Sequence, residues 1–198
     1  MNWVVGILIA LVVALGVWLS LTIGSIDIPQ ESAASATTTT ATYAEYTDPD
    51  GRFSVRYPAG YTVEATGANT ILKVNPQIAA GTNLATDSGV ILEVIPPGQG
   101  GGPECSAGRF FDQGTSNYGQ EITQNGVVYS FASNTGAAAG NRYDEYVYAL
   151  KGSSPCVGVR YFIHYGVIEN YPKGTTTNFD REALLRQFDS IRESLTLQ

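Results

Sequence analysis

The sequence predicts an α+β domain in which helices flank an antiparallel β-sheet, with one transmembrane helix in front of it. Three observations lead to this prediction. Residues 3–23 contain no charged side chain and are almost wholly apolar. Several later segments alternate apolar and polar residues with the period of two that is typical of a β-strand. Residues 180–194 repeat apolar residues at helical spacing.

The apolar run at the start has the length of a membrane span. Its 21 residues make a helix of about 31 Å, which matches the hydrocarbon core of a bilayer. A secretory signal would have a basic start, an apolar run of about 7–15 residues and a small-residue cleavage site close behind it. This chain has no Lys or Arg before Arg52, and its Ala-x-Ala match at 34–36 lies beyond Pro29. We therefore expect residues 1–24 to be an uncleaved anchor.

The side of the membrane on which the domain lies is predicted from the short tail before the helix. Basic residues near the helix ends normally set the orientation, and here there are none. A short uncharged tail is easily kept inside while a long domain crosses, and Asp27 and Glu31 follow the helix. We expect a single-pass protein of the cell membrane with its domain on the extracytoplasmic side.

The remainder of the chain divides into a tether and one domain. Residues 25–42 are a predicted flexible tether, since residues 32–42 are all Ala, Ser or Thr. Residues 43–198 are long enough to bury the core of a single domain. All 11 basic residues and 16 of the 18 acidic residues lie in this domain, which gives it a formal charge of −5. An acidic domain without a basic cluster argues against a nucleic-acid partner.

Alternating residues predict three strands early in the domain. A turn at 48–51 precedes the first, at 52–57, in which every second residue is apolar. Two more follow at 61–65 and 69–75. Residues 89–95 are apolar at almost every position, which is typical of a strand that is covered on both faces.

The second half of the domain carries the strongest hairpin signal. Asn125 and Gly126 are the residues that a type I′ turn prefers, because both central positions need a positive φ. The predicted strand pairs are 121–124 with 127–131 and, across a turn at 151–155, 143–150 with 156–165.

The one long helix of the domain is predicted at 180–194. Asp180 is a good N-cap residue. The apolar residues form a stripe that should lie on a sheet face, and residues 195–198 follow as a short final strand. The stripe consists of Leu184, Phe188, Ile191 and Leu195.

The two cysteines predict one disulfide. Exported domains oxidise their thiols, and Cys105 and Cys156 are the only cysteines of the chain. A bond between them would tie the Gly-rich loop at 96–103 to the start of the strand at 156–165.

No motif in the sequence predicts catalysis. There is no Gly-x-Ser-x-Gly, His-Glu-x-x-His or Cys-x-x-Cys. His164 is the only histidine and could act as a base beside Arg160 or Glu169, but a single histidine on a strand is more often structural. The Asp-x-Asp-Gly at 48–51 lacks the other ligands of a calcium loop. We therefore predict no catalytic residue, no cofactor and no metal site.

Tyrosine gives the clearest binding hypothesis, with 12 residues in the chain. Tyr146 and Tyr148 share one strand face, where they could stack on a sugar or on a protein partner. The alternative is that they fill the core beneath a helix, and binding would then lie in the loops expected at 98–103 and 133–141. The candidate binding surface consists of Tyr146, Tyr148, Arg160 and His164.

Two segments resemble PsbP-like domains. Residues 51–61 (Gly-Arg-Phe-Ser-Val-Arg-Tyr-Pro-Ala-Gly-Tyr) are similar to their opening strand and turn, and residues 188–195 (Phe-Asp-Ser-Ile-Arg-Glu-Ser-Leu) to their last helix and strand. The resemblance spans residues 43–198, although only its ends carry motifs. It implies an α/β/α sandwich, often secreted or membrane-attached, and non-enzymatic, as in the plant members that bind a photosystem. The anchor, the tether and the cysteine pair depart from that subgroup, and no functional residue is carried over.

The sequence thus predicts a membrane-anchored, extracytoplasmic, non-enzymatic binding or assembly module with an unknown protein or glycan partner. One alternative is a cell-surface hydrolase that uses His164. Another is a structural, pilus-like subunit, although the helix lacks the early acidic residue that pilin assembly helices carry.

Overall fold

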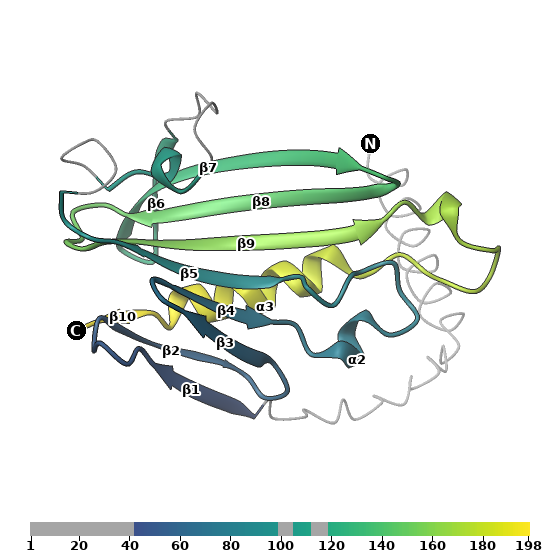
Figure 1. Cartoon of the computed structure of the whole chain (residues 1–198), viewed down its shortest axis with the longest axis horizontal. Helices are drawn as coiled ribbons and strands as arrows, with labels where there is room; N and C mark the ends of the chain where they lie inside the picture. The colour runs from purple at the N-terminus through teal and green to yellow at the C-terminus, as the bar shows by residue number, and fades with distance from the viewer. Residues whose placement is uncertain (1–41, 99–104, 112–118) are drawn as a thin grey trace, which may run out of the picture. The chain divides into compact units, whose positions relative to one another are not determined.

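The computed structural model describes residues 42–98, 105–111 and 119–198, and the predicted anchor lies outside them. These residues form two antiparallel sheets (Figure 1), a large one with the order β3-β4-β5-β9-β8-β7-β6 and a small one with the order β1-β2-β10. The strands are β1 (Tyr43–Thr47), β2 (Phe53–Pro58), β3 (Thr62–Thr66), β4 (Asn69–Lys73), β5 (Gly89–Ile95), β6 (Gln120–Gln124), β7 (Val127–Ala138), β8 (Asn141–Leu150), β9 (Cys156–Gly166) and β10 (Thr196–Leu197). The helices are α2 (Pro76–Ala79), α3 (Arg181–Glu193) and the 3-10 helices η1 (Ala107–Phe110) and η2 (Ile168–Asn170).

Helix α3 runs along the large sheet and closes the main core (Figure 1). Its first turn is capped as predicted, because the Asp180 carboxylate accepts a hydrogen bond from the backbone N–H of Ala183 at 2.9 Å. The predicted stripe is confirmed in that Leu184, Phe188 and Ile191 are buried. The small sheet contributes Phe53 and Val55 of β2 to the same core, so α3 is held between the two sheets.

The centre of the large sheet is formed by β5 and β9. In β9 the alternate residues Val157, Val159, Tyr161 and Ile163 are buried in the main core, as the alternation predicts. Their neighbours Gly158, Arg160, Phe162 and His164 therefore lie on the opposite face. We call the two sides of the large sheet the α3 face and, after the 3-10 helix that packs on the other side, the η1 face.

Two type I′ hairpins follow one another in the second half of the domain. Asn125 and Gly126 have φ of 51° and 80°, which confirms the predicted turn. Ala139 and Gly140 have φ of 49° and 80° and form a second such turn. The loop expected at 133–141 is therefore wrong, because β7 continues to Ala138 and pairs with β8 from Ser133↔Tyr146 onward. Small residues exposed on both faces leave no apolar alternation there to predict a strand.

The helical layers differ from the α/β/α sandwich that the resemblance implied. In the described ranges, α3 covers one face, whereas η1, a single 3-10 turn, packs against the other face at one end. The part of the predicted fold class that the structure confirms is the antiparallel sheet; the helices that accompany it are few. Sequence reasoning also missed β1, since its half-buried residues are only Ala44 and Tyr46.

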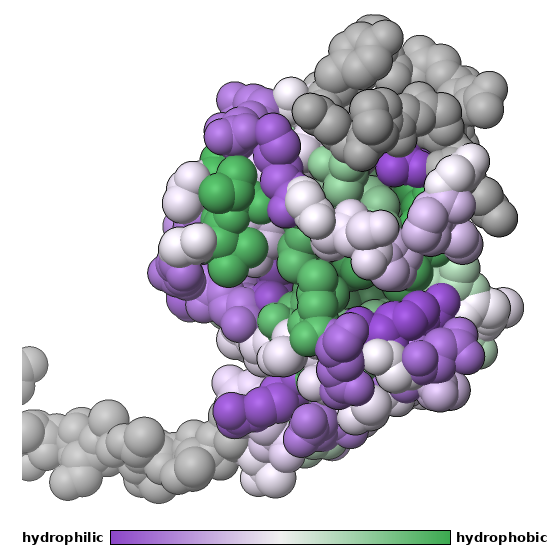
Figure 2. Space-filling view, turned by 90° about the vertical axis from the view of Figure 1, so that its left-hand side faces the viewer, coloured by the Kyte–Doolittle hydropathy of each residue, from purple (hydrophilic) through white to green (hydrophobic). Residues whose placement is uncertain are grey.

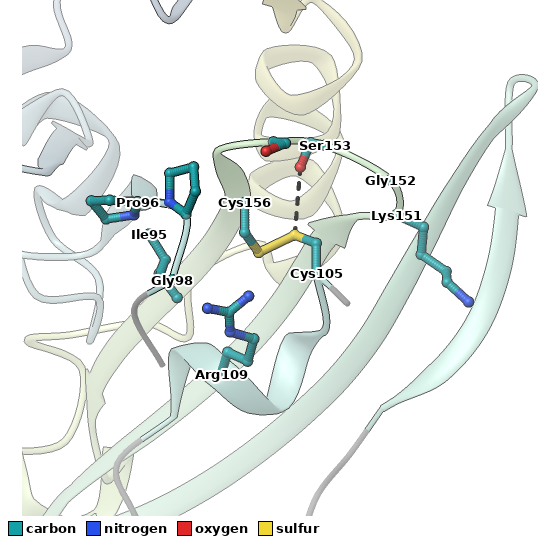
Figure 3. A pocket seen from close by; sticks show the side chains of 11 residues that line it. Ile95, Pro96, Gly98, Cys105, Arg109, Lys151, Gly152, Ser153 and Cys156 are labelled. Atoms are coloured by element: carbon teal, nitrogen blue, oxygen red, sulfur yellow. Dashed lines mark hydrogen bonds between the residues drawn. A yellow bond between two sulfur atoms is a disulfide. The ribbon is translucent and has the colours of Figure 1, made fainter. Parts of the chain in front are cut away.

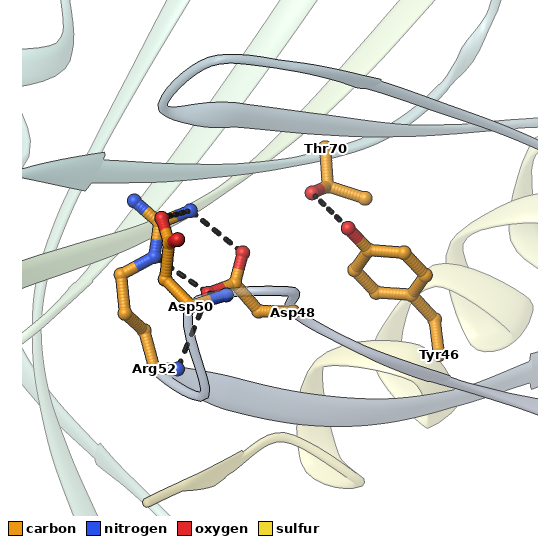
Figure 4. Close-up of polar contacts among 5 residues, drawn as sticks. All are labelled: Tyr46, Asp48, Asp50, Arg52 and Thr70. Atoms are coloured by element: carbon orange, nitrogen blue, oxygen red, sulfur yellow. Dashed lines mark hydrogen bonds and ion pairs between the residues drawn. The ribbon is translucent and has the colours of Figure 1, made fainter.

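A buried ion pair closes the turn between β1 and β2 (Figure 4). The Asp48 carboxylate accepts two hydrogen bonds of 2.6 Å from the guanidinium of Arg52, and further ones from the backbone N–H groups of Asp50 and Arg52. These donors, the guanidinium first, hold the pKa of Asp48 below its ordinary value of 3.8. Beside the turn, the Thr70 hydroxyl of β4 donates to the Tyr46 hydroxyl of β1 at 3.3 Å and links the two sheets.

The predicted disulfide is present between Cys105 and Cys156, with the Cα atoms 5.1 Å apart. It joins Cys105, two residues before η1, to the first residue of β9 (Figure 3). Within residues 42–98, 105–111 and 119–198, the structure contains no helix with the length and apolar character that crossing a bilayer requires.

Removing the disulfide should destabilise the domain strongly. The bond closes a loop with a sequence separation of 51, and Cys105→Ser with Cys156→Ser should lower the free energy of unfolding by about 4 kcal/mol in the chain-entropy model. Urea denaturation of the full-length protein in detergent measures this. Wild-type protein treated with a reductant is the control and should behave like the double variant; an unchanged midpoint after reduction would contradict the prediction.

The pair at the β1–β2 turn should make stability depend on acid. Because the pKa of Asp48 is lower in the folded protein, its contribution is present above the ordinary pKa of 3.8 and is lost as pH falls through the folded value. Asp48→Asn should lower the free energy of unfolding by about 2 kcal/mol at neutral pH. On acidification, the variant should lose less of this free energy than the wild-type protein does. Denaturation series across pH measure both effects, with Asp50→Asn as the exposed control. Parallel pH curves for wild type and Asp48→Asn would show that the pair contributes nothing.

Candidate binding face on the large sheet

The structure divides the candidate surface predicted from the sequence between the two faces of the large sheet. Tyr146 pairs with Tyr161, whose ring points into the core beneath α3. Arg160 and His164 alternate with these core residues and lie on the η1 face. The four residues therefore do not form one surface, because register places neighbours of a strand on opposite sides.

On the α3 face, Tyr148 belongs to a cage around a buried cation. Arg192 of α3 is 2% exposed, and its guanidinium lies 4.5 Å from the ring centre of Tyr148 and 5.1 Å from that of Tyr129. Its Nε–H donates to the Tyr161 hydroxyl at 2.8 Å, and Nη2 donates to Asp189 at 3.0 Å. Burial raises the pKa of Tyr148 to about 12, so the phenol stays neutral beside the cation.

Tyr146 is engaged by the residue that starts α3. The Arg181 guanidinium donates to the Tyr146 hydroxyl and to the carboxylate of Asp144, both at 2.7 Å. The ring of Tyr146 also stacks on Phe131, with the ring centres 6.5 Å apart. Both tyrosines of the predicted surface thus contribute to the attachment of α3, as the alternative interpretation of the sequence holds.

On the η1 face, η1 covers one end of the sheet. Phe110 packs onto Gly158, where a Cβ atom would lie 2.6 Å from the ring. Any larger residue at this position would displace the ring, so the absence of a side chain lets η1 approach the strand. The Phe110 carbonyl accepts a hydrogen bond from Arg160, and the Arg160 guanidinium lies 5.6 Å from the ring centre of Phe111.

A half-buried ion network occupies the middle of the η1 face. Arg160 binds Glu93 of β5 through two hydrogen bonds of 2.9 and 3.1 Å and Glu145 of β8 through one of 2.8 Å. Burial raises the pKa of Glu93, and the guanidinium opposes this rise. The predicted candidate Arg160 is thus a bridge across three strands, which fixes the spacing of the two carboxylates.

Beyond this network, three partly buried rings form what we call the aromatic platform: Tyr143, Phe162 and His164. Tyr143 of β8 lies opposite His164 of β9, and their rings stack with centres 4.6 Å apart and planes at 21°. The ring centre of Phe162 lies 6.2 Å from that of Tyr143. The platform lies on the same face as the ion network, and η1 packs on the other end of this face.

Asp87 is the residue of this site that sequence reasoning missed. Its carboxylate oxygens lie 2.8 and 3.0 Å from Nδ1 of His164. The neighbouring Ser88 brings it there, because the Ser88 hydroxyl donates to the His164 carbonyl at 3.1 Å and accepts from the His164 N–H at 3.0 Å. Residues 77 positions apart meet in this way, and no local pattern in the sequence could have signalled it.

The described residues offer neither a metal cage nor a nucleophile for His164. Among residues 42–98, 105–111 and 119–198, no three His, Cys, Asp or Glu side chains are grouped to hold a metal ion. The Asp-x-Asp-Gly turn uses its first carboxylate to bind Arg52. In this part of the chain Nε2 of His164 is buried and has no hydrogen-bond partner.

A hollow of about 370 Å³ lies beside the disulfide (Figure 3). Ile95, Pro96 and Ser153 line it; Arg109 also lines it and points toward the disulfide. Lys151 at its edge pairs with Glu121 at 2.7 Å. Figure 2 looks at this end of the molecule and shows apolar residues exposed between polar ones. The hollow borders Gly98 and Cys105, between which lies the rest of the loop predicted at 98–103, outside the described residues.

The fold is similar to three solved structures at low sequence identity. Saccharomyces cerevisiae Ran-binding protein Mog1p matches 80% of this chain over 96% of its own length, with 11% identity and a TM-score of 0.49. PsbP (CyanoP) of Synechocystis sp. PCC 6803 matches 84% over 99%, with 12% identity and a TM-score of 0.43. A protein of Bacteroides thetaiotaomicron matches 78% with 10% identity and a TM-score of 0.47, and the chain spans about half (48%) of that protein's length. No protein-family model and no curated protein matches the sequence.

The cage around Arg192 predicts which tyrosine substitutions the fold tolerates. Tyr148→Ala should cost about 3 kcal/mol, because it removes a core ring and leaves the buried cation without one of its two ring contacts. Tyr148→Phe keeps the ring and should change stability by no more than about 0.5 kcal/mol. Chemical denaturation of the two variants measures the difference. Equal stabilities would show that the ring is a surface feature and not part of the core.

Proposed function

We propose that this chain is a non-enzymatic binding module, held at a membrane by residues 1–24 with its domain on the extracytoplasmic side, and that it binds its partner through the aromatic platform. The observation that carries the proposal is that Tyr143, Phe162 and His164 lie together on the η1 face and are only partly buried, with the His164 side chain 19% exposed. Tyr129 and Tyr161 of the opposite face are buried beside Arg192 of α3. Among the described residues, neither the core beneath α3 nor the cluster around η1 includes a platform residue, so the parts of these rings that remain exposed can meet a ligand.

The platform is also held rigidly enough to bind without large rearrangement. Tyr143 and His164 lie on the paired strands β8 and β9, near the middle of the large sheet. Asp87 fixes the imidazole through Nδ1, and Ser88 fixes the backbone of the same residue from β5's side. A site whose rings are already ordered loses little conformational entropy when it binds.

The contact between Asp87 and His164 also favours a second function, the hydrolase that uses His164. In catalytic triads a carboxylate orients Nδ1–H in this way, and Nε2 then takes a proton from the nucleophile. A working base needs a hydroxyl, a thiol or a water within hydrogen-bonding distance of Nε2. In the described part of the chain Nε2 is buried and meets no such group. This geometry gives binding the better support.

Site-specific photocrosslinking in intact cells tests the proposal. A full-length chain with p-benzoylphenylalanine in place of Tyr143 should form one discrete adduct on illumination, because the platform contacts the partner. Protease added outside the cells should release that adduct by cutting the tether, if the domain lies outside. The matched control carries the same crosslinker in place of Tyr43, an exposed tyrosine of β1 in the small sheet.

Three results would contradict the proposal. The same adducts from both positions would show that the platform is not the binding site. An adduct that protease reaches only after lysis would reverse the orientation. A measurable turnover that His164→Ala abolishes, while the variant keeps the wild-type midpoint in urea, would establish the enzyme instead.

A further inference from the structure

We propose that the group bound by the aromatic platform is a cation, the guanidinium of Arg or the ammonium of Lys on a basic segment of the partner protein. This inference rests on the proposed function, since it specifies the partner's chemistry at the same platform. Three features carry it: the local balance of charge, the carboxylate oxygens that remain open, and the arrangement of the rings.

The balance of charge around the platform is negative. Asp87, Glu93 and Glu145 lie on this side of the sheet, and the two glutamates share one guanidinium, that of Arg160. Arg109 of η1 lies at the other end of this face, beside the disulfide. Lys73 and Glu64 pair with each other at 2.7 Å, and Arg142 of β8 lies on the α3 face. The formal charge of −5 on residues 43–198 has the same sign. A positively charged partner is therefore attracted both at long range and at the platform itself.

Two carboxylates at the platform have room for another donor. Asp87 is 54% exposed and contacts only Nδ1 of His164 among the described residues, whereas a carboxylate can accept about four hydrogen bonds. Glu145 binds Arg160 through Oε1 alone, and Oε2 receives no hydrogen bond from the described residues. Its side chain is 22% exposed. Both groups can accept from a ligand without giving up their present contacts.

These carboxylates lie at the edge of the rings, so that a guanidinium stacked on a ring could also reach a carboxylate. Glu145 lies opposite Phe162 in the strand register, and Asp87 contacts His164. The rings present electron-rich faces, which attract a cation within about 6 Å of the ring centre. A planar guanidinium can stack on such a face while its N–H groups reach carboxylates at its edge. A neutral sugar would use the same ring faces, but it would gain nothing from the excess of negative charge.

Titration of the full-length protein in zwitterionic detergent micelles with two short peptides tests this inference. The probe is an acetylated and amidated peptide of alternating Gly and Arg, and its matched control has citrulline, which is similar in shape and uncharged, in place of Arg. Two-dimensional NMR of the labelled protein follows the amide signals of residues 143, 162 and 164. We expect the Arg peptide to shift these signals at millimolar concentration, the citrulline peptide to leave them unchanged, and high salt to suppress the shifts.

Matched variants assign the charge effect to the platform. Asp87→Asn with Glu145→Gln should raise the dissociation constant of the Arg peptide at least about tenfold, because it removes both bordering charges. Asp50→Asn with Glu182→Gln removes the same net charge at two strongly exposed sites away from the platform and should change binding less than about twofold. The dispersed NMR spectrum of each variant shows that it is folded. Asp87→Asn alone remains informative if the double variant does not fold.

Several outcomes would overturn the inference. Equal binding of the citrulline peptide, or no shift at the platform with millimolar Arg peptide, would exclude a cation as the ligand. Equal loss of affinity in the two double variants would show that the Arg peptide responds to the overall charge of the domain and not to a site at the platform. Salt-independent shifts at the platform with a chitin trisaccharide, but not with the Arg peptide, would assign a glycan. In that case the photocrosslinking result and the proposed function would still stand. If the crosslinker at residue 143 forms no adduct at all, both the proposed function and this inference are wrong.

Discussion

The burial of Arg192 is the interaction on which the arrangement of this domain depends. A cation that is 2% exposed has lost its water, and it must recover that free energy from its neighbours. It does so with hydrogen bonds to Tyr161 and Asp189 and with the rings of Tyr129 and Tyr148. These partners come from β7, β8, β9 and α3, so the position of the helix on the sheet is fixed by one side chain.

Because α3 is fixed in this way, one face of the large sheet is covered by the helix and the other is not. The tyrosine-rich side becomes a closed interior, in which Arg181 engages Tyr146 and Asp144 at the start of the helix. Within the described ranges, η1 covers one end of the η1 face, where Gly158 admits it and Arg160 holds it by its contact with the Phe110 carbonyl. Tyr171 packs against Gly166 at the other end. Between them lie the partly buried aromatic platform and its carboxylates, where we propose that a partner binds.

Charge also has different consequences on the two faces. Beneath α3, Arg192 is enclosed by rings and by Asp189, so its contribution is structural. On the η1 face, Arg160 binds both carboxylate oxygens of Glu93 but only one oxygen of Glu145, and Asp87 is half exposed. Beneath α3, aromatic rings surround a positive charge of the protein itself. On the η1 face, aromatic rings lie beside negatively charged carboxylates, and the positive charge would come from a partner. This arrangement is the physical basis for a cationic ligand.

The elements themselves were predictable because their signals are local. Alternation predicted β2 and β9, and a nearly continuous apolar run predicted β5. The 3.6-residue period and Asp180 predicted α3, and Asn125-Gly126 predicted a hairpin. The two cysteines gave the disulfide. Prediction failed at β1 and in the second half of β7, where the residues are small or exposed on both sides and burial leaves no pattern. The site was harder to predict, since Arg160 and His164 were singled out but placed on one surface with Tyr146 and Tyr148.

From the sequence alone we could predict most of the strands, the long helix, the disulfide and the lack of a recognisable catalytic motif, because each of these depends on residues that are neighbours in the chain or on residue type. The tertiary structure alone decided which faces the candidates occupy and which residues they meet. The contact of Asp87 with His164, the bridge from Arg160 to Glu93 and Glu145, and the cage of Arg192 all join residues far apart in the chain. Such contacts follow from strand register and from the docking of α3, and these are set by the burial of the whole core and not by any one segment.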